Sequence, residues 1–313
     1  MQLVSVILPA HNEAAGIGAT VQAVLRQTSG DVAVEVIVVD DGSTDATAEN
    51  AQAAGARVIR LAGPGGGPAA ARNRGAAAAR GDPLVFLDAD CVPRPGWLAA
   101  LLAAHAGGAV VVGGALDLPP GLPALARCDY YCGWYLVHSR RDAGWVPHHP
   151  PPNLSIRRAA FLATPGFSEE PHLRYTNEER ALQAELRRAG HRIYFEPKAV
   201  VYHYNRPTLG NLLRRNYRWA YTALESKSGS GSARMAWLYR YPRLLIAAAA
   251  PLAVAHTGYI LACWARAGIF EPVLMLPAVL LSRFAYAAGM VAGGLDWLRR
   301  RGTAEPGRPP RWQ

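Results

Sequence analysis

The chain has 313 residues, half of them hydrophobic, and this length and composition exclude a disordered segment or a small disulfide-held domain. Its net charge of +10 comes almost entirely from arginine, because Lys198 and Lys227 are the only lysines, and it suits an anionic partner such as a phosphate-bearing substrate or an acidic membrane surface. The four cysteines are too few and too scattered for a disulfide framework, so we expect a reduced, cytosolic compartment.

The N-terminal third of the chain alternates strand and helix patterns. Continuous apolar runs predict strands buried on both faces, and the segments between them predict helices. Such alternation is typical of an α/β fold with a Rossmann-like, mostly parallel sheet flanked by helices. The predicted strands are Leu3–Pro9, Val34–Val39, Arg57–Leu61, Leu84–Leu87 and Val110–Gly113, and the predicted helices are Glu13–Gln27, a segment from Asp45, Pro68–Ala79 and Pro95–His105.

Polar residues follow several of these strands at the point where each strand ends. In such sheets ligands bind outside the carboxyl ends of the strands, so we expect one cleft to collect these side chains. The oxygen-only pair Asp88 and Asp90 suits Mg²⁺ or Mn²⁺, and a solvated turn is the alternative. A second acidic pair at a neighbouring strand end favours the metal. The strand-end residues are His11, Asn12, Asp40, Asp41, Asp88 and Asp90.

The middle of the chain, residues 116–225, is less regular. Prolines interrupt the pattern at 119–123 and 150–152, on either side of an aromatic segment that is compatible with a helix. Further predicted elements are the helix Glu178–Ala189, the strands Arg192–Phe195 and Ala199–His203, and the basic, amphipathic helix Leu209–Leu224.

Four segments taken together resemble a known family: SVILPAHNEA (5–14), VVDDGSTDAT (38–47), AARNRGAAAARG (70–81) and FLDADC (86–91). In order and spacing they resemble the inverting family 2 glycosyltransferases with the GT-A fold, and the resemblance continues to VVYHYN (200–205). It implies a GT-A domain that transfers a sugar from a nucleotide-diphosphate sugar with the help of Mg²⁺ or Mn²⁺.

The resemblance also implies roles for individual residues. Asp90 is the expected main metal ligand, joined by Asp88 and His203. The family has an aspartate base where this chain has Glu179, so both Glu179 and Glu178 are candidates for the general base. The residues expected beside the nucleotide-sugar are Pro9, Ala10, Asn12, Glu13, Asp40, Asp41, Arg72, Asp88, Ala89 and Asn153.

The segment RNYRW, Arg215–Trp219, resembles a degenerate form of the QxxRW motif of processive polysaccharide synthases. Arginine replaces the glutamine, so we expect addition of a single sugar rather than processive synthesis. Arg215, Arg218 and Trp219 are expected on the acceptor or diphosphate side.

The composition becomes strongly apolar after Arg243. Leu244–Ala265 is about long enough to cross a bilayer, and Pro272–Leu295 is a second apolar stretch, interrupted by Arg283. Flanking arginines predict that both ends face the cytoplasm, which gives a hairpin at the cytoplasmic face of the cell membrane. Helices that lie in the membrane plane or are buried in a soluble domain are the alternative, and Arg283 favours it.

These patterns predict a glycosyltransferase domain over 1–225, divided into a nucleotide-sugar half (1–115) and an acceptor half (116–225), then a juxtamembrane linker (226–242), membrane-associated helices (243–301) and a disordered tail (302–313). The expected reaction is metal-dependent, inverting transfer from a nucleotide-diphosphate sugar, most simply a UDP-sugar, in cell-envelope or polysaccharide biosynthesis. The expected acceptor is a hydroxyl or phosphate of a lipid-linked or saccharide molecule. A catalytically silent nucleotide-sugar-binding protein is the alternative. We expect no nucleic-acid partner, and the sequence does not indicate an oligomeric state.

Overall fold

The structure is a computed structural model that describes residues 2–28, 30–61, 65–170, 177–205, 208–228, 238–239 and 241–303. The chain divides into two compact units: unit 1 comprises residues 1–120 and 137–204, and unit 2 comprises residues 121–136 and 205–313. The domain limits expected from the sequence were drawn between segments of different expected function, and they stay a prediction. The predicted linker and tail lie mostly outside the described residues.

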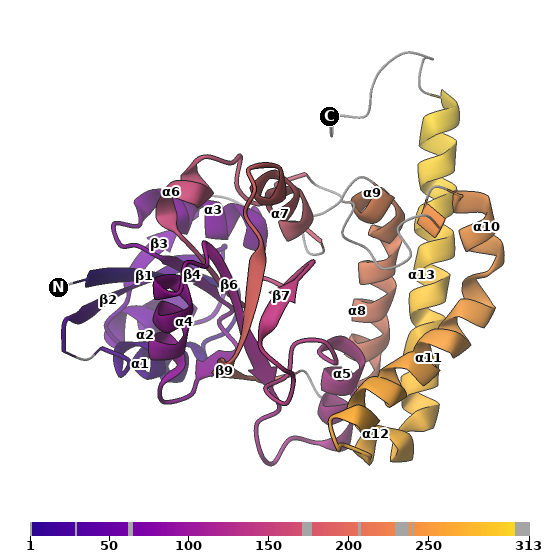
Figure 1. Ribbon diagram of the computed structural model, residues 1–313, viewed down its shortest axis with the longest axis horizontal. Coiled ribbons are helices and arrows are strands. Elements are labelled where there is room, and N and C mark those ends of the chain that lie inside the picture. Colours follow the sequence, from indigo (N-terminus) through magenta and orange to yellow (C-terminus); the bar gives the residue numbers. More distant parts are fainter. Residues whose placement is uncertain are drawn as a thin grey trace. The chain divides into compact units, whose positions relative to one another are not determined.

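Unit 1 is built on a mixed sheet (Figure 1). Strands β3, β2, β1 and β4 are parallel, as the alternating pattern predicted. The sheet continues through β8, β6, β9 and β5, where most pairings are antiparallel, and β7 pairs with β9. The strands are β1 Gln2–Ala10, β2 Val32–Asp40, β3 Arg57–Arg60, β4 Leu84–Leu87, β5 Cys91–Pro93, β6 Val111–Asp117, β7 Gly144–Val146, β8 Asn153–Ile156 and β9 Ile193–His203.

Helices cover both faces of this sheet, which confirms the α/β fold class. Helices α1 and α2 lie on one face of the sheet and α3 lies on the other (Figure 1). The reason is that the chain crosses the sheet in one direction from β1 to β2 to β3 and returns in the other direction to β4, while each crossover is right-handed. The helices are α1 Ile17–Leu25, α2 Thr47–Ala53, α3 Pro68–Ala78, α4 Trp97–Ala106, α6 Arg158–Leu162 and α7 Glu179–Arg188. The first helix begins later than predicted, because the Glu13 carbonyl accepts the N–H groups of Gly16 and Ile17 in a turn.

The predicted strands Arg192–Phe195 and Ala199–His203 are one strand, β9. Its pairing with β6 shifts register between Gly114 and Ala115, so the residues around Pro197 form a bulge in a continuous strand. The prolyl residue interrupts the apolar pattern without ending the strand.

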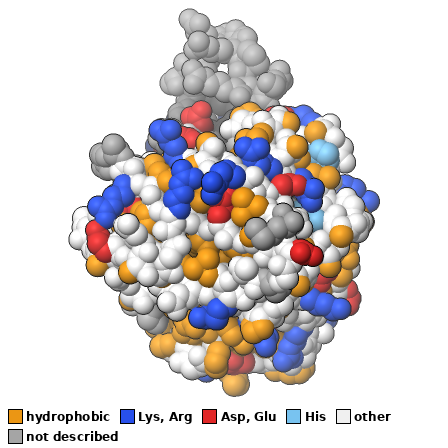
Figure 2. Space-filling view, turned by 90° about the vertical axis from the view of Figure 1, so that its left-hand side faces the viewer, with side chains coloured by type: hydrophobic (Ala, Val, Ile, Leu, Met, Phe, Trp, Pro, Cys, Tyr) orange, Lys and Arg blue, Asp and Glu red, His pale blue; other side chains and the backbone are white. Residues whose placement is uncertain are grey.

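Two arginines on the surface of unit 1 form ion pairs with acidic neighbours. Arg60 pairs with Glu49, and Arg157 pairs with Asp82 at 2.6 Å. On the face drawn in Figure 2, Lys and Arg side chains lie beside Asp and Glu side chains and among hydrophobic ones.

Unit 2 is helical over its described residues. The apolar stretch Leu244–Ala265, predicted as one helix, is divided at Ala248. Pro251 explains the break, because its ring excludes the carbonyl of the residue four positions earlier and it has no N–H to donate. The helices are α5 Ala124–Gly133, α8 Leu209–Tyr221, α9 Ala223–Ser228, α10 Pro242–Ala247, α11 Ala249–Arg266, α12 Glu271–Leu274 and α13 Leu276–Thr303.

Helix α13 packs closely along α8 within unit 2. A Cβ on Gly289 or Gly293 would fall inside the contact distance of the carbonyl oxygens of Tyr217 and Tyr221, so the two backbones meet only because these positions are glycine. Arg283 is buried at this contact and donates a hydrogen bond to the Asn216 side chain. Among the described residues, one helical segment, Leu276–Arg299 of α13, is long and apolar enough to cross a membrane.

Candidate active site

The loops after β1 and β2 are held together by hydrogen bonds. The strands pair in parallel up to Ala10 and Asp40. Asn12 has a left-handed backbone (φ 56°), and its side-chain oxygen accepts the Thr44 N–H at 2.8 Å. Asp40 accepts the Ser43 N–H at 3.0 Å. The predicted nucleotide-side residues Asn12 and Asp40 therefore lie on one rigid pair of loops.

Asp41 holds the glycine-rich loop that precedes α3. Its two carboxylate oxygens accept the backbone N–H groups of Gly66 at 2.6 Å and Gly67 at 2.8 Å. A Cβ at Gly65 would lie only 2.5 Å from the Asp41 carbonyl oxygen, so this approach requires glycine. Asp41 thus fixes the point at which α3 begins.

Arg72 on α3 connects two acidic residues. It is only 3% exposed, and it donates from Nη2 to Asp88 Oδ1 at 2.6 Å and from Nη1 to Glu178 Oε1 at 2.7 Å. Burial disfavours the positive charge, but the two carboxylates outweigh burial and raise the pKa of Arg72. Gly75 lets α3 approach β1 closely, because any side chain there would meet Ile7. A permanently charged guanidinium is therefore fixed beside the end of β4.

The turn after β4 carries Asp88, Ala89 and Asp90. The Ala89 carbonyl accepts the Thr20 hydroxyl of α1 at 2.9 Å, and the Asp90 carbonyl accepts the Tyr204 N–H at 3.0 Å. The turn is thus attached both to α1 and to the end of β9.

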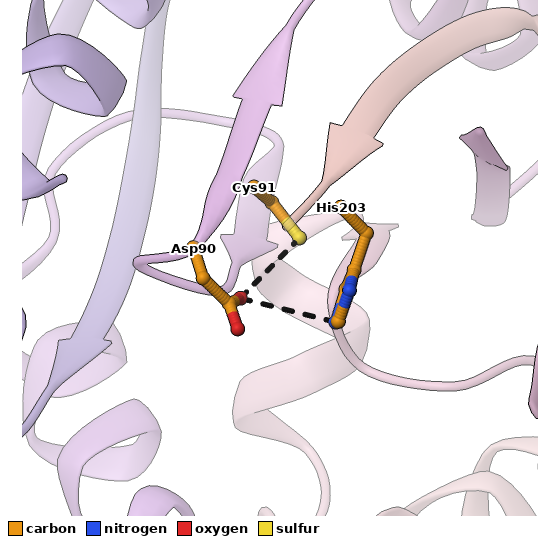
Figure 3. Close-up of side chains that lie close together, drawn as sticks. All are labelled: Asp90, Cys91 and His203. Atoms are coloured by element: carbon orange, nitrogen blue, oxygen red, sulfur yellow. Dashed lines mark hydrogen bonds and ion pairs between the residues drawn. The ribbon is translucent and has the colours of Figure 1, made fainter. Parts of the chain in front are cut away.

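Asp90, Cys91 and His203 lie together at this turn (Figure 3). In the antiparallel pairing of β5 and β9, Cys91 lies opposite His203. Asp90 Oδ1 lies 3.9 Å from His203 Nε2 and 3.8 Å from Cys91 Sγ. Burial, and the nearby carboxylates, raise the pKa of the Cys91 thiol well above its ordinary value, so the thiol stays protonated.

This donor set fits a divalent metal ion. Metal–ligand distances of about 2.1 Å place two ligand atoms on one ion about 3–4 Å apart, which includes the 3.9 Å between Asp90 Oδ1 and His203 Nε2. Carboxylate and imidazole ligands together suit an ion such as Mn²⁺. Asp88 is instead directed to Arg72, and its place among the ligands stays a prediction.

The two candidate bases begin α7 and have different partners. Glu178 is 6% exposed and accepts from Arg72, whereas Glu179 is 4% exposed and its Oε1 lies 2.5 Å from His148 Nε2. Burial, and the charge of Glu179, raise the pKa of Glu178 against the opposing effect of Arg72. Burial also opposes the charge of Glu179, but the hydrogen bond and charge of His148 outweigh it and lower the pKa of Glu179. As the pH rises, Glu179 therefore loses its proton at a lower pH than Glu178 does.

The remaining predicted donor-side residues belong to the framework of this site. Asn153 lies opposite Leu87 in the sheet, is fully buried, and donates to the carbonyls of Ala115 at 2.9 Å and Ala199 at 2.8 Å. Pro9 is the buried, second-to-last residue of β1, and the Glu13 N–H donates to the Thr47 side chain. Their contacts with a nucleotide-sugar stay a prediction.

The predicted acceptor-side residues lie in unit 2. Arg215 forms an ion pair with the Asp129 carboxylate at 2.5 Å and donates to the Asp129 backbone carbonyl at 2.8 Å, and its guanidinium lies over the Trp219 ring at 4.5 Å. This stack explains the spacing of arginine and tryptophan in RNYRW, since residues four apart share a helix face. Arg218 is exposed on the same helix.

Sequence reasoning missed Cys91 and His148. Cys91 reaches the site through strand pairing with a residue far away in the sequence, which no local pattern reveals. His148 stands in the segment HHPPP, where the prolines indicated a break but gave no direction to the side chains.

Known proteins resemble this chain in sequence and in fold. Residues 5–164 match the family described as Glycosyl transferase family 2. The chain is 31% identical to the pre-mycofactocin glycosyltransferase of Mycobacterium tuberculosis, over 98% of this chain and 74% of that protein. Its fold is similar to that of a mannosyltransferase from Pyrobaculum calidifontis in complex with GDP-Man and Mn²⁺, with a TM-score of 0.58 and 20% identity over 95% of this chain and 87% of that one.

A further solved structure is similar at somewhat higher identity. It is glucosyl-3-phosphoglycerate synthase from Mycobacterium tuberculosis in complex with Mg²⁺ and UDP, with a TM-score of 0.50 and 25% identity over 75% of this chain and 81% of that one. The family match over about half of the chain and the 31% identity to a relative over 98% of this chain lead to one conclusion: the chain belongs to glycosyl transferase family 2 and is a glycosyltransferase.

Proposed function

We propose that the chain transfers a sugar from a nucleotide-diphosphate donor to an acceptor, with inversion at the anomeric carbon and with a divalent metal at the strand ends of unit 1. The observation that carries this proposal is the meeting of Asp90 and His203 at a distance suited to one ion. Arg72 links Asp88 to Glu178, the residue that precedes α7.

The transfer requires that the negative charge of the leaving diphosphate is stabilised and that a hydroxyl acceptor loses its proton. The bond from the anomeric carbon to the diphosphate breaks, and its electron pair leaves with the diphosphate. A metal ion held by Asp90 and His203 would supply the positive charge that stabilises this leaving group. A carboxylate at the start of α7 accepts the proton of the acceptor as the acceptor oxygen attacks from the opposite face.

The relatives support particular substrates to test first. UDP is bound in glucosyl-3-phosphoglycerate synthase, which is 25% identical, and this supports a UDP-sugar as the first donor. The relative named pre-mycofactocin glycosyltransferase is similar over 98% of this chain, so pre-mycofactocin belongs among the acceptors to test, beside lipid-linked saccharides.

Unit 2 is the proposed membrane-attached part of the chain, at the cytoplasmic face. Phe270 and Leu274 are 65% and 85% exposed, although both are large and apolar. Helix α8 lies along the middle of α13 and carries the exposed Arg214 and Arg218, so a bilayer-spanning α13 would place these arginines at hydrocarbon depth. This supports helices that lie in the interface rather than a spanning hairpin.

The test uses the full chain in detergent with a panel of UDP-, GDP- and TDP-sugars, with and without Mn²⁺. Donor binding is read by calorimetry, and turnover is read as released nucleoside diphosphate. We expect one donor class to bind with Mn²⁺ and to turn over with an acceptor. Binding without turnover for every acceptor would instead indicate a silent nucleotide-sugar-binding protein, and absence of donor binding would contradict the proposal.

A further inference from the structure

A short segment between β7 and β8, residues 147–150, lies against one face of α7. We call it the histidine strap. The Pro147 carbonyl accepts a hydrogen bond from Arg187 at 3.1 Å, and the His149 carbonyl accepts one from Gln183 at 2.5 Å. The α7 residues that contact the strap are Glu179, Gln183 and Arg187. They are four residues apart, so one face of the helix makes all three contacts.

His149 fixes the strap to the sheet. Its ring is fully buried, with Nε2 2.8 Å from the Gly114 carbonyl oxygen, and it stacks on Phe195 at 6.1 Å between ring centroids. Gly113 provides the space, because a Cβ there would overlap the imidazole. The strap is therefore held from two sides, by the sheet and by α7.

This double attachment places His148 opposite Glu179. His148 Nε2 lies 2.5 Å from Glu179 Oε1, and the histidine side chain is 24% exposed whereas that of Glu179 is 6% exposed. Among the described residues, no side chain donates to Glu179 Oε2. The neighbouring Glu178 faces the other way, toward Arg72. The two adjacent carboxylates thus differ in environment: one is held by an arginine and the other by a histidine.

We propose that His148 is a positioning residue, which donates its Nε2–H to Glu179 Oε1 and so directs Glu179 Oε2 to the acceptor as the general base. This inference rests on the proposed transferase function and selects between the two candidate carboxylates. The acceptor proton moves to Glu179 Oε2, the acceptor oxygen uses its lone pair to bond the anomeric carbon, and the bond to the diphosphate breaks with its electron pair on the diphosphate.

The charges around Glu179 agree with this role. Loss of the His148 contact would leave a buried carboxylate whose pKa rises, because burial is the largest opposing effect. Glu178, by contrast, has a raised pKa, and its partner Arg72 also donates to Asp88, so Glu178 belongs to the ion-pair group at the end of β4. Among the described residues, the charged and titratable groups around Glu179 and its partners are His148 and His149 of the strap, Glu178 and Arg180 of α7, Arg72 of α3, and Arg141 near His149.

A base that is positioned in this way narrows the acceptor class. A phosphate monoester is largely ionised at pH 7, since its second pKa is about 6, and it attacks without giving up a proton. A hydroxyl must lose its proton as it attacks. The His148–Glu179 pair therefore indicates a hydroxyl acceptor rather than a phosphate.

The test compares His148→Phe and His148→Gln with the unaltered full-length enzyme, using kcat as a function of pH and donor affinity by calorimetry. We expect His148→Phe to lower kcat at pH 7 by about 30-fold, within the range of general-base contributions, with donor Kd changed less than about two-fold. The acid limb of the kcat–pH profile of His148→Phe moves to higher pH by about one unit or more, because Glu179 loses the partner that keeps it ionised. His148→Gln restores an N–H donor and recovers most of kcat.

His191→Phe is the matched control, because His191 follows the other end of α7, and it should leave kcat and its pH profile unchanged. Wild-type kcat and an unmoved acid limb in His148→Phe would overturn the role of His148 while the transferase function stands. Equal losses of donor affinity and kcat would also overturn it, since they indicate a general structural defect. Absence of turnover by the unaltered enzyme would overturn the proposed function and this inference together.

Discussion

At the scale of single residues, the charge arrangement of the site depends most on Arg72. It is nearly buried and forms ion pairs with Asp88 and Glu178 at 2.6 and 2.7 Å. A buried ion pair adds little net stability compared with well-packed apolar residues, but removal of one partner leaves a charge without compensation. Arg72 is therefore more costly to remove than its number of contacts suggests.

We predict that Arg72→Met destabilises the protein by about 3 kcal/mol, because two carboxylates lose their shared cation and the Glu178 carboxylate is buried. The measurement is the denaturant midpoint at pH 7. Arg74→Met is the control, since Arg74 is an exposed neighbour on the same helix and should change stability by less than about 0.5 kcal/mol. Equal midpoints for the two variants would show that the ion pairs contribute nothing.

The sequence predicted which residues meet at the strand ends better than it predicted the other partners of these residues. Asp90 and His203 were predicted together through the family resemblance, and the structure brings them together. The partners Cys91 and His148 were not predicted, because their positions follow from the pairing of β5 with β9 and from the strap on α7. Such contacts join residues distant in the chain, whereas periodicity reports only which face of an element is buried.

At the scale of elements, the contact of α13 with α8 shows why an apolar helix need not be surrounded by lipid. Gly289 and Gly293 are four residues apart and form one smooth stripe on α13. The carbonyls of Tyr217 and Tyr221 occupy that stripe. The sequence predicted the apolar stretch and its interruption by Arg283. Only the fold shows that Asn216 is the hydrogen-bond partner of this arginine.

We expect Gly293→Ala to destabilise unit 2 by about 2 kcal/mol, because the added methyl group meets the Tyr221 carbonyl and the helices must separate. Thermal unfolding of the full chain in detergent, followed by circular dichroism, measures the effect. Gly258→Ala on α11 is the control: a Cβ there has nothing within 4 Å, so the substitution should stabilise the helix by about 0.5 kcal/mol. The account of the α8–α13 contact fails if both variants unfold at the same temperature.

Element boundaries were predicted less well than element types. The sequence indicated two strands where β9 is continuous, since a bulge absorbs Pro197 while pairing with β6 resumes on both sides. It indicated one long helix where α10 and α11 are separate, since the backbone effect of Pro251 outweighs apolar composition. The two prolines have opposite consequences: the strand continues past Pro197, whereas the helix is divided near Pro251. Pairing with a neighbouring strand accounts for the continuous strand.

At the scale of the whole molecule, the chain combines a sheet unit that carries the proposed chemistry with a helical unit that carries most of the exposed large apolar side chains among the described residues. Phe270 and Leu274 are the most exposed of these. Under the proposed membrane attachment, an interfacial lipid layer would cover these large apolar side chains and would suit the adjoining arginines.

We predict that the full chain floats with vesicles that contain about one-third anionic lipid and floats less with neutral vesicles, since arginines and apolar side chains contribute together. Changing both Phe270 and Leu274 to Glu should lower the bound fraction several-fold. Leu162→Glu is the control, because Leu162 is 50% exposed in unit 1 and lies outside the proposed membrane surface. Equal binding by all three proteins would place the membrane contact elsewhere.

The most direct test of the central claim is the release of nucleoside diphosphate from the preferred donor as a function of Mn²⁺ concentration, after chelator treatment. The unaltered enzyme and Asp142→Asn, an exposed carboxylate of unit 1, should regain full turnover as Mn²⁺ is added. Asp90→Asn should need at least about ten-fold more Mn²⁺ and remain slow, because one ligand of the ion is weakened. Turnover that is independent of Mn²⁺, or an Asp90→Asn profile equal to that of Asp142→Asn, would contradict a metal site at Asp90 and His203.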